Sequence, residues 1–300
     1  MGTIHRDTCP VCGSDRLRPG PAVTDHMVSG EVFHIVHCRS CTAAFTQDAP
    51  DTDSIAPYYA SDDYISHSDT RDGLLNRIYH AVRGRMLRRK MRWVQRNAPG
   101  LRAIDIGAGT GYFCESLTQA GFEATGYEPD ERARATAAER GVTLHSMEAF
   151  SDRSADSADV VTMWHVLEHV HDLHGMVHHI HEVLTANGTL ILALPNHRSA
   201  DARVYGAAWK AWDVPKHLYH FTPEAVDRLC DAHDLVVYRR RQLPFDPFYI
   251  ALLSEQQAGS WWTALLRLPA VPLWSWLRGA ITARAASSVV YFIKKRPHGA

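Results

Sequence analysis

The segment at residues 104–113, IDIGAGTGYF, combines one acid with three glycines at alternate positions. Residues 104–106 are typical of the end of a buried strand, and the pattern after Tyr112 is typical of a helix. A tight turn from strand to helix through glycines brings bare backbone close to a ligand and leaves the first N–H groups of the helix unpaired. The segment therefore predicts a ligand-binding loop, whose glycines are Gly107, Gly109 and Gly111.

The spacing of this loop indicates the kind of ligand. Dinucleotide-binding turns follow G-x-G-x-x-G, and the third glycine of that pattern would fall at Tyr112 here. The chain has D-x-G-x-G-x-G instead, with Asp105 ahead of the first glycine. A carboxylate at that place repels a pyrophosphate but suits a cationic, amine-bearing ligand. The loop therefore favours such a ligand over a nucleotide phosphate.

Four of the six cysteines form two C-x-x-C pairs, one in CPVCG and one in CRSC. In a reducing compartment, two such pairs predict a structural zinc site of four thiolates. A four-thiolate site has no open coordination position, so we assign it to folding rather than to catalysis. Two redox dithiols or a cluster of buried thiols are the alternatives. The predicted ligands are Cys9, Cys12, Cys38 and Cys41.

The elements that would position these residues alternate between strand and helix from Leu101 onward. Such alternation predicts a parallel, doubly wound sheet. An amphipathic helix over residues 73–97 precedes it. The arginines of this helix are expected to form a solvated face, with a site for an anionic partner as the alternative. The expected strands of the sheet are 103–106, 123–127, 142–145, 159–164, 189–194, 234–243 and 287–296.

The glycine loop and the strand order resemble those of class I S-adenosylmethionine (SAM)-dependent methyltransferases. Within that class, the chain is similar to the group that contains ubiquinone-biosynthesis-type O-methyltransferases and many small-molecule relatives. The resemblance covers about residues 75–297 and implies SAM as the cofactor. It also implies an α/β fold with a Rossmann-like, doubly wound sheet of seven strands. In this family the sheet is mostly parallel, and the last strand inserts antiparallel between the fifth and the sixth.

The resemblance assigns roles to individual residues around the cofactor. The glycine loop would wrap the methionine part of SAM, and Glu128, which ends the second strand, would hold the ribose hydroxyls. Met147 and Glu148 follow the third strand, where the family meets the adenine ring, although Met147 is equally well explained as a core residue. The complete set of expected SAM contacts is Asp105, Gly107, Gly109, Gly111, Glu128, Met147, Glu148 and Trp164.

Histidines are the candidates for the general base, because the pKa of histidine lies near working pH. His165 stands at the carboxyl end of the fourth strand, where ligands of such sheets bind. His217 and His220 lie in PKHLYHFT, which resembles a recurrent segment of the family. We rank His217 first, His165 second and His220 third, with Asp213 as a candidate for orienting one of them. His220 has a structural alternative, which is to order the turn before a helix capped by Thr222.

Three regions are expected along the chain. Residues 1–48 form the zinc ribbon, residues 49–72 a linker or lid, and residues 73–300 the methyltransferase domain. That domain carries a tryptophan-rich insert at about 244–286. We expect the insert to cover a lipophilic substrate. Pairing of two subunits and contact with a membrane surface, both through residues 261–278, are the alternatives.

The composition of the chain bears on whether the protein binds nucleic acid, is secreted or spans a membrane. The 300 residues hold 32 Lys and Arg against 33 Asp and Glu, so no global basic field exists to gather nucleic acid. The first residues lack the apolar core of a signal peptide, and no 18-residue stretch is free of both charge and proline. A cytoplasmic location is the expectation.

The leading functional hypothesis is methyl transfer from SAM to a small molecule, at a hydroxyl oxygen, with a histidine as base and a structural zinc. An RNA-base methyltransferase that uses the ribbon to recognise RNA is the first alternative. The near-neutral charge opposes it, as does the absence of an Asn/Asp-Pro-Pro-aromatic signature after the fourth strand, where Trp164 and His165 stand instead. A non-catalytic SAM-binding protein is the second alternative. Sugars, polyketides, phenols and lipid-linked intermediates all remain open as acceptors.

Overall fold

A seven-stranded sheet organises most of the chain. The computed structural model describes residues 2–59, 74–258 and 261–297, and it gives only the backbone for 74–81 and 261–263. The strands lie in the order β12-β13-β10-β9-β6-β7-β8. They are β6 (Arg102–Ile106), β7 (Glu123–Tyr127), β8 (Leu144–His145), β9 (Ala158–Trp164), β10 (Leu184–Pro195), β12 (Leu235–Gln242) and β13 (Ser288–Lys295).

The direction of the strands confirms the predicted fold class. β6 pairs in parallel with β7 and β9, and β10 pairs in parallel with β9. β13 lies between β10 and β12 and is antiparallel to both. The α/β fold, with a mostly parallel sheet and an antiparallel last strand, is therefore as the sequence predicts.

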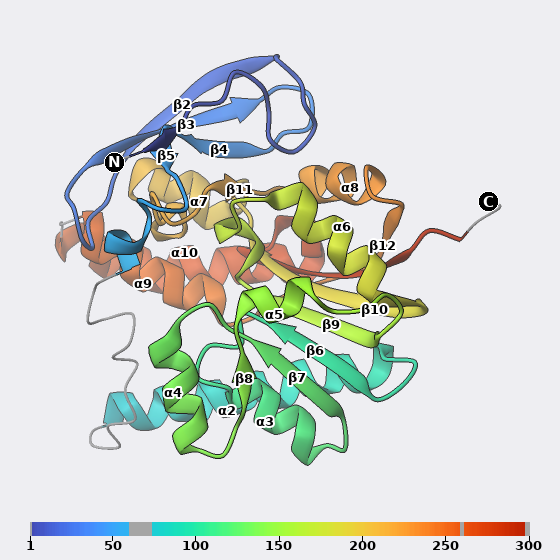
Figure 1. Ribbon diagram of the computed structural model, residues 1–300. Coiled ribbons are helices and arrows are strands. Elements are labelled where there is room, and N and C mark those ends of the chain that lie inside the picture. The colour runs from blue at the N-terminus through green and yellow to red at the C-terminus, as the bar shows by residue number, and fades with distance from the viewer. Residues whose placement is uncertain (1, 60–73, 259–260, 298–300) are drawn as a thin grey trace.

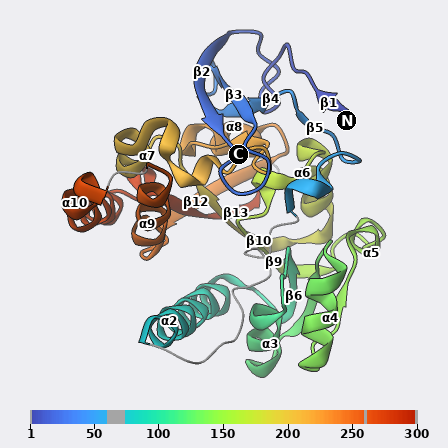
Figure 2. The same cartoon turned by 90° about the vertical axis from the view of Figure 1, so that its left-hand side faces the viewer.

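Helices cover both faces of this sheet, which explains why its central strands are mostly apolar. Val160, Val161 and Met163 of β9 are fully buried. In Figure 2 the sheet is flanked by α5 and α6 on one side and by α2, α9 and α10 on the other. The helices that follow the first strands are α2 (Leu74–Asn97), α3 (Tyr112–Gln119), α4 (Glu131–Glu139), α5 (Met147–Ser151) and α6 (Leu173–Val183).

Side-chain caps set where several helices begin. The sequence predicts a helix over residues 167–184, but the Asp172 carboxylate accepts a hydrogen bond from the N–H of Gly175, so α6 starts at Leu173. The residues between form a short 3-10 helix, η2 (Leu167–His169). Thr222 accepts from the N–H of Ala225 at the start of α8 (Pro223–Asp231), as the sequence predicts. The starts of α6 and α8 matter because the segment with His165 precedes α6, and the segment with His217 and His220 precedes α8.

The N-terminal strands form a second sheet above the body of the molecule (Figure 1). Its order is β11-β4-β3-β2, and every pairing in it is antiparallel. Because β11 comes from the segment that carries His217 and His220, this sheet is not closed within residues 1–48. The three-region division remains a prediction, and residues 60–73 of the expected linker lie outside the described part of the chain. The strands are β2 (Leu17–Thr24), β3 (Val32–Cys38), β4 (Ala44–Gln47) and β11 (Tyr219–His220), with β1 (Thr3–Ile4) paired to β5 (Ala49–Pro50).

The tryptophan-rich insert is a pair of helices. α9 (Asp246–Ala258) and α10 (Trp261–Ile281) pack on one another, and α10 also packs on α7 (Ala200–Tyr205). α10 continues through Pro269 and Pro272. Within the described residues, no helix is both long enough and apolar enough to cross a bilayer.

Candidate active site

The glycine loop follows β6 with a backbone that side chains would not tolerate. Gly107 has φ +70°, and a Cβ there would lie 2.3 Å from Cγ2 of Val166. Gly109 has φ +54°, and a Cβ there would meet no atom within 4 Å. The first glycine therefore allows close packing against the segment after β9, while the second leaves open space above the loop. Such a cradle fits a ligand that approaches the backbone directly.

Two buried acids flank this loop. Asp105 is buried and accepts a hydrogen bond from Oγ1 of Thr162 at 2.5 Å. Burial raises the pKa of Asp105 to about 6, although the bond from Thr162 and the charge of Lys90 oppose the rise. At neutral pH the carboxyl is therefore mostly ionised, as binding of a cationic amine requires.

Glu128 ends β7 and closes the other side of the loop. Its Oε2 accepts from the N–H of Gly109 at 2.7 Å, and its Oε1 accepts from the N–H of Asp130 at 3.0 Å. Burial raises its pKa, while these backbone bonds oppose the rise. The carboxylate stands beside the loop, where vicinal hydroxyls of a ribose could be bound. Asp105, Gly107, Gly109 and Glu128 therefore form one cradle that fits SAM.

The remaining expected cofactor contacts lie on either side of this cradle. The Trp164 ring stacks on Trp93 with centroids 6.3 Å apart, and Nζ of Lys90 lies 4.3 Å from the Trp164 centroid. Met147 packs against the main hydrophobic core, and Glu148 is exposed and hydrogen-bonded to Ser146. The roles of Met147 and Glu148 toward an adenine ring stay predictions.

His165 lies at the carboxyl end of β9, as expected, between two carboxylates. Its Nε2 is 3.1 Å from Oδ2 of Asp246, and its Nδ1 is 3.4 Å from Oε1 of Glu168. Burial alone would lower the pKa of His165, but the hydrogen bond to Asp246 and the ion pair with Glu168 raise it to about 10. At neutral pH this residue is an imidazolium with both nitrogens engaged. It therefore has no lone pair with which to accept a proton from a substrate.

His217 has the opposite surroundings. It is buried, and its Nδ1 lies 2.9 Å from the carbonyl oxygen of Ala211. Because a carbonyl can only accept, Nδ1 carries the hydrogen and Nε2 keeps its lone pair. Burial lowers the pKa of His217, although Glu168 and Asp213 oppose this. Of the three ranked histidines, His217 therefore best combines a neutral ring with a free acceptor nitrogen.

His169 adds a second neutral imidazole beside His217. Their ring centroids are 4.6 Å apart, and Nδ1 of His169 lies 3.1 Å from the carbonyl oxygen of Lys216. Burial lowers the pKa of His169 to about 4. Within the described residues, neither carboxylate oxygen of the buried Glu168 receives a hydrogen bond. Ligand atoms of Glu168, His169 and His217 lie within 4.8 Å of one another, a set able to hold a divalent cation.

His220 is a structural residue in this arrangement. It is buried in β11, packs edge-on against Trp212 at 4.7 Å, and places Nε2 3.1 Å from Oγ1 of Thr46. Burial holds its pKa well below the usual range. These contacts favour the structural alternative over a role as base.

Two residues that reach the site from distant parts of the chain were not predicted from the sequence. Thr46 of the ribbon donates from Oγ1 to the carbonyl oxygen of His217 at 2.7 Å, and its N–H donates to the carbonyl oxygen of Leu218 at 3.0 Å. Asp246 reaches His165 from the first turn of α9. No local pattern marks either residue, because each acts across a long stretch of chain.

Asp213 contributes through the backbone rather than through its carboxylate. Its carbonyl oxygen accepts from the N–H of His217 at 3.0 Å. The carboxylate pairs with Lys210 at 2.9 Å and Lys216 at 3.1 Å. Burial alone would raise its pKa, but the two lysines hold it below the usual range. This cluster fixes the turn that leads into His217.

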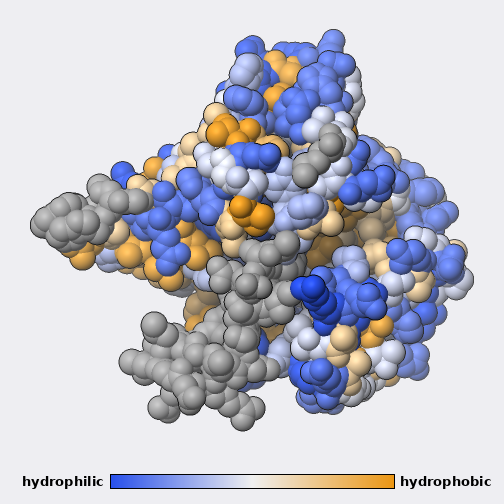
Figure 3. All heavy atoms as spheres, turned by 60° about the vertical axis from the view of Figure 1, so that its left-hand side comes forward, coloured by the Kyte–Doolittle hydropathy of each residue, from blue (hydrophilic) through white to orange (hydrophobic). Residues whose placement is uncertain are grey.

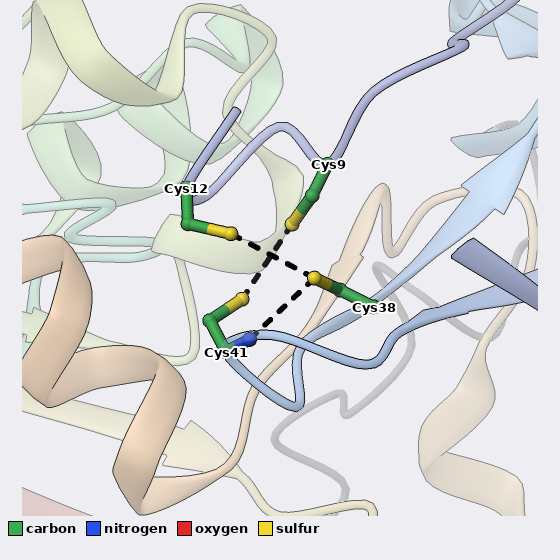
Figure 4. A group of neighbouring side chains, drawn as sticks. All are labelled: Cys9, Cys12, Cys38 and Cys41. Atoms are coloured by element: carbon green, nitrogen blue, oxygen red, sulfur yellow. Dashed lines mark hydrogen bonds between the residues drawn. The ribbon is translucent and has the colours of Figure 1, made fainter. Parts of the chain in front are cut away.

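The four predicted zinc ligands converge at the end of the ribbon. Figure 4 shows their sulfurs facing one another, with Sγ of Cys9 3.6 Å from that of Cys41 and Sγ of Cys12 3.7 Å from that of Cys38. A tetrahedral ion with Zn–S bonds of about 2.3 Å requires sulfurs roughly 3.8 Å apart. The N–H of Ser40 also donates to Cys38 Sγ at 3.3 Å. The thiols are unbridged, so the donor set fits a structural zinc ion.

The family is decided by a match to a methyltransferase-domain model over residues 78–239, which is more than half of the chain. The chain belongs to the methyltransferase-domain family. The class I, SAM-dependent assignment made from the glycine loop agrees with this family.

Individual methyltransferases are also similar in sequence to part of this chain. The ubiquinone biosynthesis O-methyltransferase of Erwinia tasmaniensis is 32% identical over 140 residues, covering 42% of this chain and 58% of the relative. The ubiquinone biosynthesis O-methyltransferase of Haemophilus ducreyi is 29% identical over 180 residues, covering 53% of this chain and 76% of the relative. The alignment with the first of these thus spans little more than half of the relative's length.

Among solved structures, magnesium protoporphyrin IX methyltransferase from Synechocystis PCC 6803 with bound SAH is 14% identical. The match covers 76% of this chain and 90% of that chain, with a TM-score of 0.50. At this identity the likeness supports the fold alone.

Proposed function

We propose that the protein transfers the methyl group of SAM to a hydroxyl oxygen of a small-molecule acceptor. The observation that carries the proposal is the cradle of Asp105, the glycine loop and Glu128, which opens at the same strand ends as a neutral, buried His217. Acceptor oxygen is favoured because the curated relatives are named O-methyltransferases. The absence of a net basic charge supports a small acceptor over a nucleic acid.

The reaction is an in-line displacement, so alignment and proton removal are what the protein must supply. The acceptor oxygen forms a bond to the methyl carbon while the carbon–sulfur bond breaks, and the sulfonium becomes the thioether of S-adenosylhomocysteine. The proton of the hydroxyl passes to Nε2 of His217. Asp105 would hold the amino group of SAM, and Glu128 would hold the ribose hydroxyls.

The remaining residues of the site position these groups. Thr46 and Asp213 fix the backbone of His217 from two sides, and the imidazolium of His165 neutralises part of the charge of Glu168 and Asp246. A zinc ion bound by the four cysteines would hold the ribbon, and hence Thr46, in place. The zinc has no catalytic part in this proposal.

Calorimetric titration with S-adenosylhomocysteine tests the cofactor assignment. Glu128→Ala should weaken binding by roughly 1–3 kcal/mol, because it removes a charge-assisted acceptor. Glu123→Ala is the matched control, since Glu123 is an exposed acid on the same strand, and it should bind normally. NAD should not bind to either protein.

Labelled SAM then tests transfer itself, with hydroxylated lipophilic phenols and sugars as trial acceptors. Cofactor binding that ignores Glu128 in a folded variant would contradict the assignment of the cradle. Label found only on nitrogen or carbon of the product would contradict O-methylation while leaving the cofactor site intact.

A further inference from the structure

One face of α10 exposes a continuous apolar stripe. Leu266 is 76% exposed, Trp274 54% and Ile281 82%. These positions recur every seven or eight residues, so they lie on one side of the helix. The opposite side packs inward through Val271 and Ser275. The stripe is Leu266, Leu273, Trp274, Leu277 and Ile281, and α9 also exposes Phe248 and Leu252.

The surface around this stripe forms an arm that projects from the body. Figure 3 shows apolar residues gathered along the α9–α10 arm. A stripe of this length that no described residue covers marks an interaction surface. Whatever binds this surface must contact the leucine, isoleucine and tryptophan side chains of the stripe together.

The charge of two segments identifies the occupant. Residues 73–104 hold nine of the 32 Lys and Arg and none of the 33 Asp and Glu, and residues 256–300 hold six and none. These are the segments that contain α2 and α10. Eight of these basic residues lie on α2, and Arg267 and Arg278 lie on α10, while neither helix contains an acid.

The two helices lie on the same side of the central sheet, as Figure 2 shows. On α2, Arg85, Arg88, Arg92 and Arg96 are exposed, and none of them has an ion-pair partner in the described part of the chain. An apolar stripe and unpaired arginines on the same side of the sheet together have the composition of a surface that lies in a lipid interface.

We propose that α10 binds the interface of an anionic lipid bilayer, with its stripe among the acyl chains and the arginines of α2 facing lipid phosphates. A second copy of the chain is a poorer occupant, because joining two stripes would bring acid-free, arginine-bearing segments together. A nucleic acid would satisfy the arginines but leave the stripe in water. The proposal does not depend on methyl transfer.

The position of the surface has a consequence for the site. α9 lies against α10 and begins at Asp246, which contacts His165. A bilayer that holds α10 would therefore lie close to the acceptor side of the site. An acceptor dissolved in the membrane could reach that side without crossing water.

Vesicle co-sedimentation of the whole, zinc-replete chain tests the proposal. Binding to phosphatidylcholine vesicles that contain one quarter phosphatidylglycerol should be at least tenfold tighter than binding to phosphatidylcholine alone, and salt should weaken it. The double variant Leu266→Glu, Ile281→Glu should lose at least tenfold in affinity. Arg88→Gln and Arg92→Gln should each lose roughly fivefold.

Val32→Glu is the matched control, because Val32 is 56% exposed on the ribbon, away from α10. It should bind vesicles normally, and thermal unfolding should show all variants to be folded. Equal binding by the double variant, or equal binding to neutral vesicles, would overturn the proposal. So would a concentration-dependent dimer that the double variant abolishes in the absence of lipid.

Discussion

The cofactor side and the acceptor side of the site are built in different ways. The cofactor side uses residues 105–128, one β-loop-α-β stretch in which Glu128 closes on Gly109 at 2.7 Å. The acceptor side combines the end of β9, the turn before β11, the first turn of α9 and the ribbon strand β4. The first side is a local structure, and the second depends on long-range packing. Changes far from the chemistry should therefore affect the acceptor side alone.

The largest effect should come from removing the proposed zinc. Binding of a structural zinc contributes about 10–16 kcal/mol to folding of small metal modules, so its loss should unfold the ribbon and release Thr46 from His217. Turnover should fall below detection while affinity for S-adenosylhomocysteine stays within threefold. Metal analysis, circular dichroism and calorimetry before and after a strong chelator measure this. Equal loss of cofactor binding would show that the two sides are not independent.

Loss of the base should rank second. His217→Ala should reduce turnover by on the order of a hundredfold to ten-thousandfold, with little change in cofactor affinity. Since burial lowers the pKa of His217, turnover of the parent protein should stay constant on lowering the pH to about 6.5 and fall only below that. His165→Ala should reduce turnover less than His217→Ala does. An acid limb that His217→Ala leaves unchanged would assign the base elsewhere.

A smaller effect isolates the contact between the ribbon and the site. Thr46→Val keeps the volume of the side chain but removes the donor to the His217 carbonyl. One lost hydrogen bond of about 1–2 kcal/mol predicts a roughly fivefold to thirtyfold fall in turnover. Cofactor affinity should not change, and Thr46→Ser should restore turnover. A Val variant with normal turnover would remove Thr46 as a positioning residue.

The smallest effect concerns the cofactor side and pH. The pKa of Asp105 is raised to about 6, so below pH 6 the ligand-free carboxyl is neutral and must lose its proton to bind a cationic amine. Affinity for S-adenosylhomocysteine should therefore fall by up to about tenfold for each pH unit below 6. Asp105→Asn should bind weakly at every pH and lose this slope. Calorimetry at pH 5, 6 and 7 would measure it, and a slope that persists in the variant would point to another group.

The same contrast explains how much could be predicted from the sequence. The glycine loop and the alternation of strands and helices follow from patterns within about 30 residues, whereas the place of the antiparallel last strand was implied by the family resemblance, and the fold class was correct. The end of β7 at Tyr127 was placed correctly, which put Glu128 beside the loop. The four cysteines converge as their spacing indicates. The glycine loop, the end of β7 and each C-x-x-C pair depend on neighbours along the chain.

The acceptor side could be predicted only in part. His165 and His217 were identified, but not that Glu168 and Asp246 hold the first as an imidazolium. That outcome depends on α9 reaching β9 across 81 residues. Thr46 lies 171 residues from the carbonyl it binds, so its role emerges only when β4 pairs with β11. Boundaries such as the start of α6 shifted because Asp172 is the effective cap.

The place of β13 in the sheet bears on how the molecule is made. This strand is synthesised after every other strand of its sheet, yet it lies between β10 and β12 and is buried from Ser288 to Ile293. During vectorial synthesis, one edge of β10 stays unpaired until β13 emerges from the ribosome. Until then β12 has no neighbouring strand in the sheet. The half with β6, β7 and β9 can assemble earlier. The cofactor cradle should therefore form on the ribosome before the sheet is complete, and the nascent chain should be most prone to aggregation in the interval before β13 emerges.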